Sequence, residues 1–328
     1  LWCSLANTFK GGIMDKISLF SRHSFASCVS EGYSFLVKQL PLVSRIMLPY
    51  YTIAALLATL SFAYNTQINV KVIVWGSVSV TEMIASMLVY TVAWVAATVA
   101  LARMFLMFRR LTAMEMAQDK ELKERNKKSG SAETFKRTMQ LALRALPYVI
   151  WPYLINMPGF PVIQPIMDAM AGMTIMYQAL FAVGIFVVLL VLAVFCTPLA
   201  YTFYCRMMKP VGLVADDKVM MEQLSFKKAY RKAFRYKWKT FTLMLWSAFL
   251  WLIACAIFLL PGIVATDAYL SSVEENVNYG VEQLIPTGGY VLVVLSGTLA
   301  LTLSYMMGVA FYSTMMYLFG DIYTKENK

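Results

Sequence analysis

The amino-acid sequence predicts an all-α, polytopic membrane protein with six transmembrane helices. Hydrophobic residues make up 59% of the 328 residues and charged residues only 14%, whereas globular domains carry about 25% charged residues. Several apolar stretches exceed the roughly 18 residues that cross a bilayer. Lys and Arg outnumber Asp and Glu by 29 to 18, and in a membrane protein such an excess marks the cytoplasmic segments. These observations exclude an ordinary soluble domain.

The apolar stretches predict six spans in order along the chain. The third is interrupted by several prolines, which remove backbone hydrogen-bond donors and kink a helix. The spans are predicted at about residues 46–64, 83–107, 143–162, 173–201, 241–264 and 290–311.

The positions of Lys and Arg predict the orientation of these spans. All of them except Lys71 lie before the first span, in the segments 103–144 and 206–239, or after the last span. The loops at 156–172 and 265–289 contain neither Lys nor Arg. Because cytoplasmic segments carry the excess of cations, both termini are predicted to face the cytoplasm, with three short hairpins outside.

The segment SFKKAYRKAFRYKWK, at 225–239, predicts an amphipathic helix that leads into the fifth span. Its apolar residues recur at helical spacing on one face: Phe226, Ala229, Tyr230, Ala233 and Phe234. The other face is basic: Lys227, Lys228, Arg231, Lys232, Arg235 and Lys239. A helix of this kind favours the headgroup layer, where each cation gains about 1 kcal/mol from anionic lipid. The expected partners are the bilayer and anionic headgroups, and no module typical of nucleic-acid binding is present. A topology anchor without a specific ligand is the alternative.

Two earlier segments resemble this helix. TFKRTMQLALRALP, at 134–147, aligns through its Thr-Phe pair with Ser225–Phe226, so that Lys136, Arg137 and Arg144 match Lys227, Lys228 and Arg235. SFASCVSEGYSFLV, at 24–37, begins with the same Ser-Phe pair but has lost most of the charge. Each copy precedes a pair of spans, and three similar segments, RMFLMFRR, FYCRMMKP and MMYLFGDIY, end the pairs.

The repeat predicts one membrane domain, at 14–328, built from three degenerate modules. Each module consists of an interfacial helix and a helical hairpin, at about 18–110, 131–210 and 222–320. Residues 1–13 are interpreted as a translated leader before a start at Met14, since KGGIM can be encoded by a purine-rich ribosome-binding sequence followed by a start codon.

The layout resembles a group of six-span bacterial membrane families, which includes the membrane domain found beside glycerophosphodiester phosphodiesterases. The resemblance lies in the interfacial helix at 225–239 and in Pro261–Gly262, a pair expected to close the following span. It implies a location in the bacterial cytoplasmic membrane and a common layout. It implies no defined activity and no functional residues.

The sequence offers few residues for catalysis. His23 is the single histidine, and the five cysteines form no metal-binding or disulfide pattern. No phosphate-binding glycine loop and no nucleophile motif are present. We therefore expect no enzymatic activity, no cofactor and no metal site. The remaining candidates form a kink or cavity in the third and fourth spans: Pro147, Pro152, Pro158, Gly159, Pro161 and Gln178.

Two functions remain open. The first is an integral membrane protein that organises lipid or partner proteins through a basic cytoplasmic face. The second is a transporter or permease for a lipid or hydrophobic solute, which would use the kinked third span. A cavity near the midplane lined by this span would favour the transporter, and a sealed core would favour the organiser.

Overall fold

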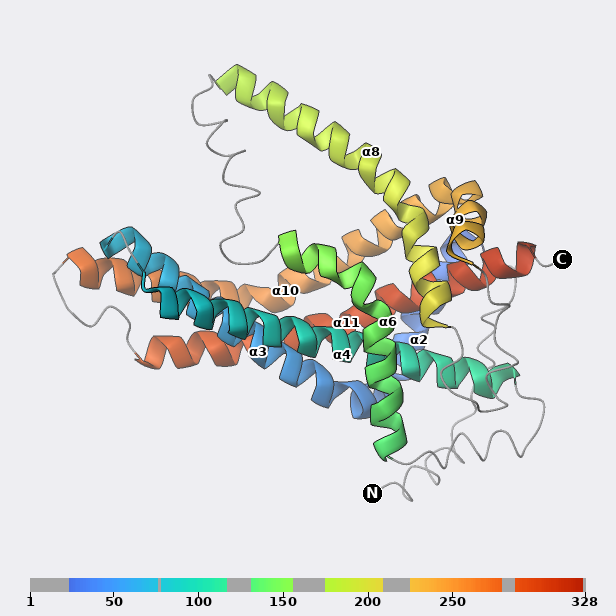
Figure 1. Cartoon of the computed structure of the whole chain (residues 1–328), viewed down its shortest axis with the longest axis horizontal. Coiled ribbons are helices and arrows are strands. Elements are labelled where there is room, and N and C mark those ends of the chain that lie inside the picture. Colours follow the sequence, from blue (N-terminus) through green and yellow to red (C-terminus); the bar gives the residue numbers. More distant parts are fainter. Residues whose placement is uncertain are drawn as a thin grey trace.

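A computed structural model describes residues 24–75, 78–116, 131–155, 175–208, 225–278 and 287–326. Within these ranges the chain is all-helical, as predicted (Figure 1). The predicted leader and Met14 lie outside the described residues. The helices are α2 (Phe25–Lys38), α3 (Leu40–Trp75), α4 (Val80–Met116), α6 (Ser131–Ile155), α8 (Ile175–Met207), α9 (Phe226–Arg235), α10 (Lys237–Asn278) and α11 (Thr287–Glu326).

Five of these helices are long and apolar enough to cross a membrane, which indicates a multi-pass membrane protein. The qualifying segments are Leu40–Ile68 in α3, Val80–Arg110 in α4, Leu190–Met207 in α8, Lys237–Ala268 in α10 and Gly288–Ile322 in α11. The predicted third span runs past the end of α6, and its residues beyond Ile155 lie outside the described ranges.

The outward faces of the spanning helices are apolar. Leu88 of α4, Val188 of α8 and Leu295 of α11 are 61%, 58% and 64% exposed. A soluble monomer rarely exposes such extended apolar surface, but hydrocarbon tails accommodate it at no cost. The first part of α8 projects away from the other helices (Figure 1), and its exposed side chains there include Val183 and Val187.

Helices α3, α4, α10 and α11 form the main bundle (Figure 1). α3 and α4 are antiparallel. Near one end of the pair, Ser86 Oγ of α4 donates a hydrogen bond to Asn65 Oδ1 of α3. Near the other end, the guanidinium carbon of Arg103 on α4 lies 5.6 Å from the ring centroid of Tyr50 on α3. α6 then runs back along α4. Near the start of α6, Arg110 Nη2 of α4 donates to Thr134 Oγ1 at 2.8 Å.

Helix α11 packs closely against both α3 and α10 because glycine lies at the contacts. A Cβ atom at Gly297 would come within 2.7 Å of Thr59 Cγ2 on α3, and one at Gly262 of α10 would lie 3.8 Å from the Cα atom of Gly297. Small residues allow helix backbones to approach closely in a membrane, where van der Waals packing and interhelical hydrogen bonds hold helices together. Thr59 Oγ1 and Thr298 Oγ1 share a 2.9 Å hydrogen bond at the same contact.

Prolines lie inside both α10 and α6. The prediction that Pro261–Gly262 closes the fifth span is wrong, because α10 continues through Pro261 to Asn278. Likewise α6 contains Pro147 and Pro152 in its interior, and its axis changes direction along its length (Figure 1). Transmembrane helices tolerate proline because neighbouring groups satisfy the freed carbonyls.

Two helices begin with the same N-cap. Ser24 Oγ accepts a hydrogen bond from the Ser27 amide at the start of α2, and Ser225 Oγ accepts one from the Lys228 amide at the start of α9. Each helix stops at one non-helical residue, Gln39 or Tyr236, before a long helix follows. The third Ser/Thr-Phe pair differs, since Thr134 lies inside α6, which begins at Ser131.

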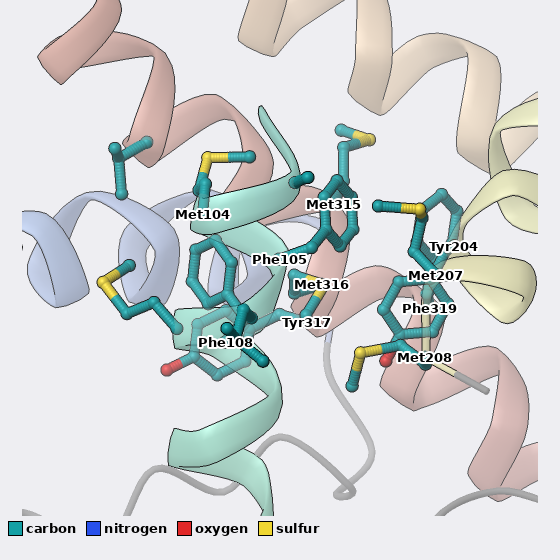
Figure 2. Packing of buried hydrophobic residues seen from close by; sticks show 14 of the residues in the cluster. Met104, Phe105, Phe108, Tyr204, Met207, Met208, Met315, Met316, Tyr317 and Phe319 are labelled. Atoms are coloured by element: carbon teal, nitrogen blue, oxygen red, sulfur yellow. The ribbon is translucent and has the colours of Figure 1, made fainter. Parts of the chain in front are cut away.

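A methionine- and aromatic-rich core lies where α2, α4, α8 and α11 meet (Figure 2). It draws on all three segments that end the predicted modules. In this core the ring centroids of Tyr204 and Phe319 are 5.0 Å apart, and those of Phe105 and Phe203 are 5.3 Å apart. Flexible methionine side chains fill the gaps between rings of different orientation: Met104, Met207, Met208, Met315 and Met316.

Candidate functional site

Helix α9 packs against α8 through its alanines. Ala229 and Ala233 are buried, and Tyr230 Oη donates to the Phe195 carbonyl of α8 at 3.1 Å. The ring of Phe234 stands 6.1 Å from that of Phe195, and Lys237 Nζ lies 3.9 Å from the Phe234 ring centroid. The predicted apolar face is therefore divided: its alanines contact protein, and Phe226 at its edge is 59% exposed.

The predicted basic face of α9 is largely exposed. Lys227, Lys228, Arg231 and Arg235 are exposed, and Lys232 is half-buried. On α6, Lys136 is exposed, whereas Arg137 and Arg144 are half-buried. These eight exposed or half-buried cations of α9 and α6 can attract anions, since opposite charges interact over roughly 8 Å at physiological ionic strength.

The structure brings Arg144 and Phe226 together in one hollow between α6, α8 and α9. This basic hollow has a volume of about 260 Å³ and is lined by Arg144, Tyr148, Thr202, Cys205, Arg206, Phe226 and Ala229. Arg206 lies in the last turn of α8 and is exposed. The sequence analysis missed Arg206, although the segment FYCRMMKP that contains it was noted as the end of a module.

A second cavity lies among α3, α4, α6, α10 and α11. This span cavity has a volume of about 420 Å³, and most of its lining is apolar or aromatic. Trp94, Trp251, Tyr305 and Tyr312 contribute rings to its wall. Trp251 Nε1 donates to the Ser304 carbonyl at 3.0 Å, so its indole is held in place. Several lining residues come from the middle of the candidate spans, which places the cavity away from both helix ends.

The residues predicted to form a kink or cavity have separate positions. Pro152 lines the span cavity, and Pro147 is exposed within α6. Gln178 belongs to α8. Pro158, Gly159 and Pro161 lie outside the described residues.

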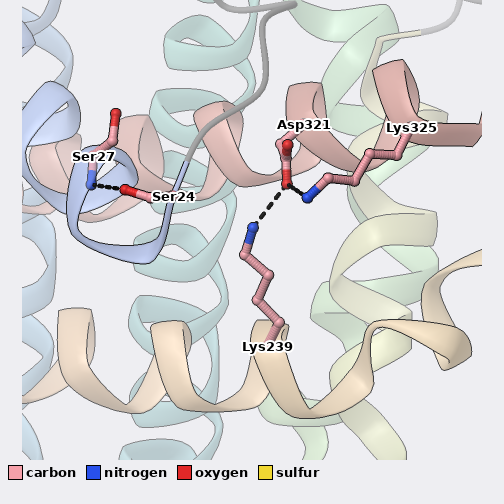
Figure 3. A network of polar contacts seen from close by, with 5 residues as sticks. All are labelled: Ser24, Ser27, Lys239, Asp321 and Lys325. Carbon is pink, nitrogen blue, oxygen red and sulfur yellow. Dashed lines mark hydrogen bonds and ion pairs between the residues drawn. The ribbon is translucent and has the colours of Figure 1, made fainter.

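A buried carboxylate that the sequence analysis did not single out lies on α11. Asp321 has no exposed surface, and its Oδ2 atom accepts from Lys239 Nζ at 2.7 Å and from Lys325 Nζ at 2.8 Å (Figure 3). Lys239 belongs to α10, so the contact joins two spanning helices. The sequence does indicate that this residue is unusual, because Asp321 is the only charged residue in the apolar segment 288–322.

Cys28 of α2 is buried near this carboxylate. The pKa of the Cys28 thiol is raised to about 11, chiefly because burial disfavours the thiolate; Lys239 acts to lower this pKa and Asp321 acts to raise it. At neutral pH the thiol is therefore protonated, and a protonated thiol is neither a nucleophile nor a good metal ligand. Across the described ranges, no three His, Cys, Asp or Glu residues gather closely enough to hold a metal ion.

Comparisons with known proteins add no relative. No family model matches the chain, and no match was found among curated proteins or solved structures.

Proposed function

We propose that the chain is a non-enzymatic integral protein of the bacterial cytoplasmic membrane that organises lipid or partner proteins through a basic cytoplasmic face. The observation that carries this proposal is the exposed row of cations on α9, which leads directly into the candidate span at the start of α10. Cations at this position meet the headgroups of the leaflet, and anionic headgroups gather around them.

The proposal includes six spans, three modules and cytoplasmic termini. Two features support the modules: α2 and α9 share a serine cap and a one-residue break, and the segments that end the modules pack into one core. The span that the five candidates lack would be the third, at residues 143–162. The layout shared with the six-span bacterial families belongs to the same proposal.

Removing four charges from α9 should abolish any enrichment of anionic lipid around the protein. The variant carries Gln at Lys227, Lys228, Arg231 and Lys232, which removes about 4 kcal/mol of attraction at ~1 kcal/mol per cation. The full chain is reconstituted in mixed phosphatidylcholine and phosphatidylglycerol, extracted in small lipid discs, and the ratio of the two lipids in the discs is measured. The parent should retain more phosphatidylglycerol than the bulk bilayer contains, and the variant should match the bulk.

A charge-preserving variant serves as the matched control. This variant carries Lys227→Arg, Lys228→Arg, Arg231→Lys and Lys232→Arg. It keeps the charge of the helix and changes only the side chains that carry it. This control should retain the enrichment of the parent. If the Gln variant enriches phosphatidylglycerol as strongly as the parent, the cations do not organise lipid and act only in topology or in protein contacts.

The span cavity favours a second function, the transport of a lipid or hydrophobic solute. Its wall is apolar, it is partly contributed by Val149 and Pro152 of α6, and residues such as Thr98 and Tyr305 place it near the middle of two candidate spans. A site of this kind accepts an apolar molecule by burying its surface, at about 25 cal/mol per Å². An acyl chain fits this description.

Filling the span cavity should prevent an apolar molecule from entering it. Ala97 and Ala248 both line it, and Phe at both positions would occupy much of its volume. A fatty acid carrying a diazirine is added to the protein in discs, and photolabelled peptides are mapped. Labelling of the peptides that contain Trp94 and Trp251 should fall several-fold in the variant, because the probe loses its space.

Leu88→Phe provides the control, since this side chain of α4 is 61% exposed on the outer face. Labelling in this variant should equal that of the parent. Equal labelling of the filled variant and the parent would show that the probe reaches those tryptophans only from the surrounding bilayer.

A further inference from the structure

The geometry points to the basic hollow as a binding site for one anionic lipid, whose phosphate lies between Arg144 of α6 and Arg206 of α8. This inference rests on the proposed function and makes it specific. The diffuse attraction of α9 for anionic lipid would then be accompanied by a defined site that holds a single headgroup.

Arg144 and Arg206 come from different helices and line the same hollow. Arg144 is half-buried and Arg206 is exposed, so the phosphate would be reached from the surface and held against a partly enclosed wall. A guanidinium group presents several N–H donors in a fixed plane, which suits the oxygens of a phosphate. Two such groups on separate helices can contact different oxygens of one phosphodiester.

The hydroxyl groups in the hollow do not supply the donors that a phosphate needs. Thr202 Oγ1 donates to the Leu199 carbonyl at 2.8 Å. The 3.2 Å hydrogen bond between Tyr148 Oη and Thr202 Oγ1 is then donated by the tyrosine. With both protons engaged, the hydroxyl pair fixes the position of α6 against α8, and recognition of the anion falls to the two arginines.

The position of the hollow favours a lipid over a free anion. Arg206 lies in the last turn of the candidate span Leu190–Met207, where α8 leaves the apolar layer. Phe226, 59% exposed, forms part of the rim. A lipid bound here would place its phosphate between the arginines and its glycerol and acyl carbons against the aromatic ring. Inorganic phosphate would contact only the charged part.

Native mass spectrometry of the full chain in a mild detergent tests this site. The protein is titrated with short-chain phosphatidylglycerol, and the masses with zero, one and two bound lipids give the dissociation constant of the first. Replacing both arginines, as Arg144→Gln with Arg206→Gln, should weaken the first binding step about thirtyfold, which corresponds to ~2 kcal/mol. Arg206→Gln alone should weaken it about fivefold, and because Arg206 is exposed this variant keeps the fold.

The matched control removes the same charge outside the hollow. Lys227→Gln with Lys228→Gln should change the first dissociation constant less than threefold, because neither lysine lines the hollow. Equal weakening by the two double variants, or no weakening by Arg206→Gln, would overturn the site. Displacement of the lipid by inorganic phosphate at a similar concentration would also overturn it, since the bound group would then be a free anion.

The outcome distinguishes this inference from the proposed function. If the arginine variants bind the first lipid normally while the four-Gln variant of α9 loses phosphatidylglycerol enrichment in discs, the basic face organises lipid without this site. If the arginine variants lose the first lipid and the α9 variant keeps its enrichment, the site exists and the proposed role of α9 fails.

Discussion

Replacing Asp321 by Asn should lower the free energy of unfolding by about 3 kcal/mol, because the change leaves two ammonium groups without their shared carboxylate in a buried contact. The amide keeps the shape of the side chain, so packing is preserved and the loss reports on charge. Lys239 is affected most, since it reaches Asp321 from α10 across the helix interface. Unfolding in detergent, followed by far-UV circular dichroism, measures the effect.

The Lys325→Gln variant shows how much of the lost stability belongs to each of the two lysines that pair with Asp321. Lys325 lies one turn away on the same helix, and its side chain is 33% exposed, so water replaces much of the interaction. An exposed pair at this spacing contributes only about 0.5 kcal/mol. If Asp321→Asn costs no more than Lys325→Gln, the buried carboxylate does not hold α10 to α11.

Adding a single methyl group at Gly32 should destabilise the contact between α2 and α11 by about 2–3 kcal/mol. A Cβ atom at Gly32 would lie 2.7 Å from the backbone nitrogen of Thr314 and 2.8 Å from its Cα atom. Those atoms belong to the backbone of a long helix and cannot move aside as a flexible side chain would. Gly32→Ala should therefore loosen α2, seen as a lower unfolding midpoint and faster amide hydrogen exchange in residues 25–38.

Gly184→Ala is the matched control because it adds the same methyl group where no atom beyond the adjoining residues and backbone of α8 lies within 4 Å. Alanine has a higher helix propensity than glycine, so this change should raise stability by up to ~1 kcal/mol. The two substitutions should thus have opposite signs. A Gly32→Ala protein as stable as the parent would show that α2 does not pack on α11 as closely as described.

Much of the local structure could be predicted from sequence because it depends on neighbours in the chain. The Ser-Phe pairs at Ser24 and Ser225 do start helices, since a serine hydroxyl satisfies an amide of the first turn. Long apolar stretches do form helices long enough to span a membrane. Pro261 does not end α10 as predicted, because transmembrane helices tolerate proline where neighbouring groups can satisfy the freed carbonyl.

The candidate sites depended on contacts between segments distant in sequence. Arg144 was singled out for its charge, but its neighbour Arg206 lies 62 positions further along the chain, and only the packing of α6 against α8 and α9 places both on one hollow. The span cavity takes residues from five helices, which no periodicity can reveal.

By itself the sequence determined the all-helical class, the apolar segments and the basic segments, because helix formation and hydropathy are properties of a short stretch of chain. Only the tertiary structure decided which face of α9 meets protein, that Asp321 is buried between two lysines, and where cavities remain. Those features arise from the shapes of several helices packed together, and each requires that distant residues meet in space.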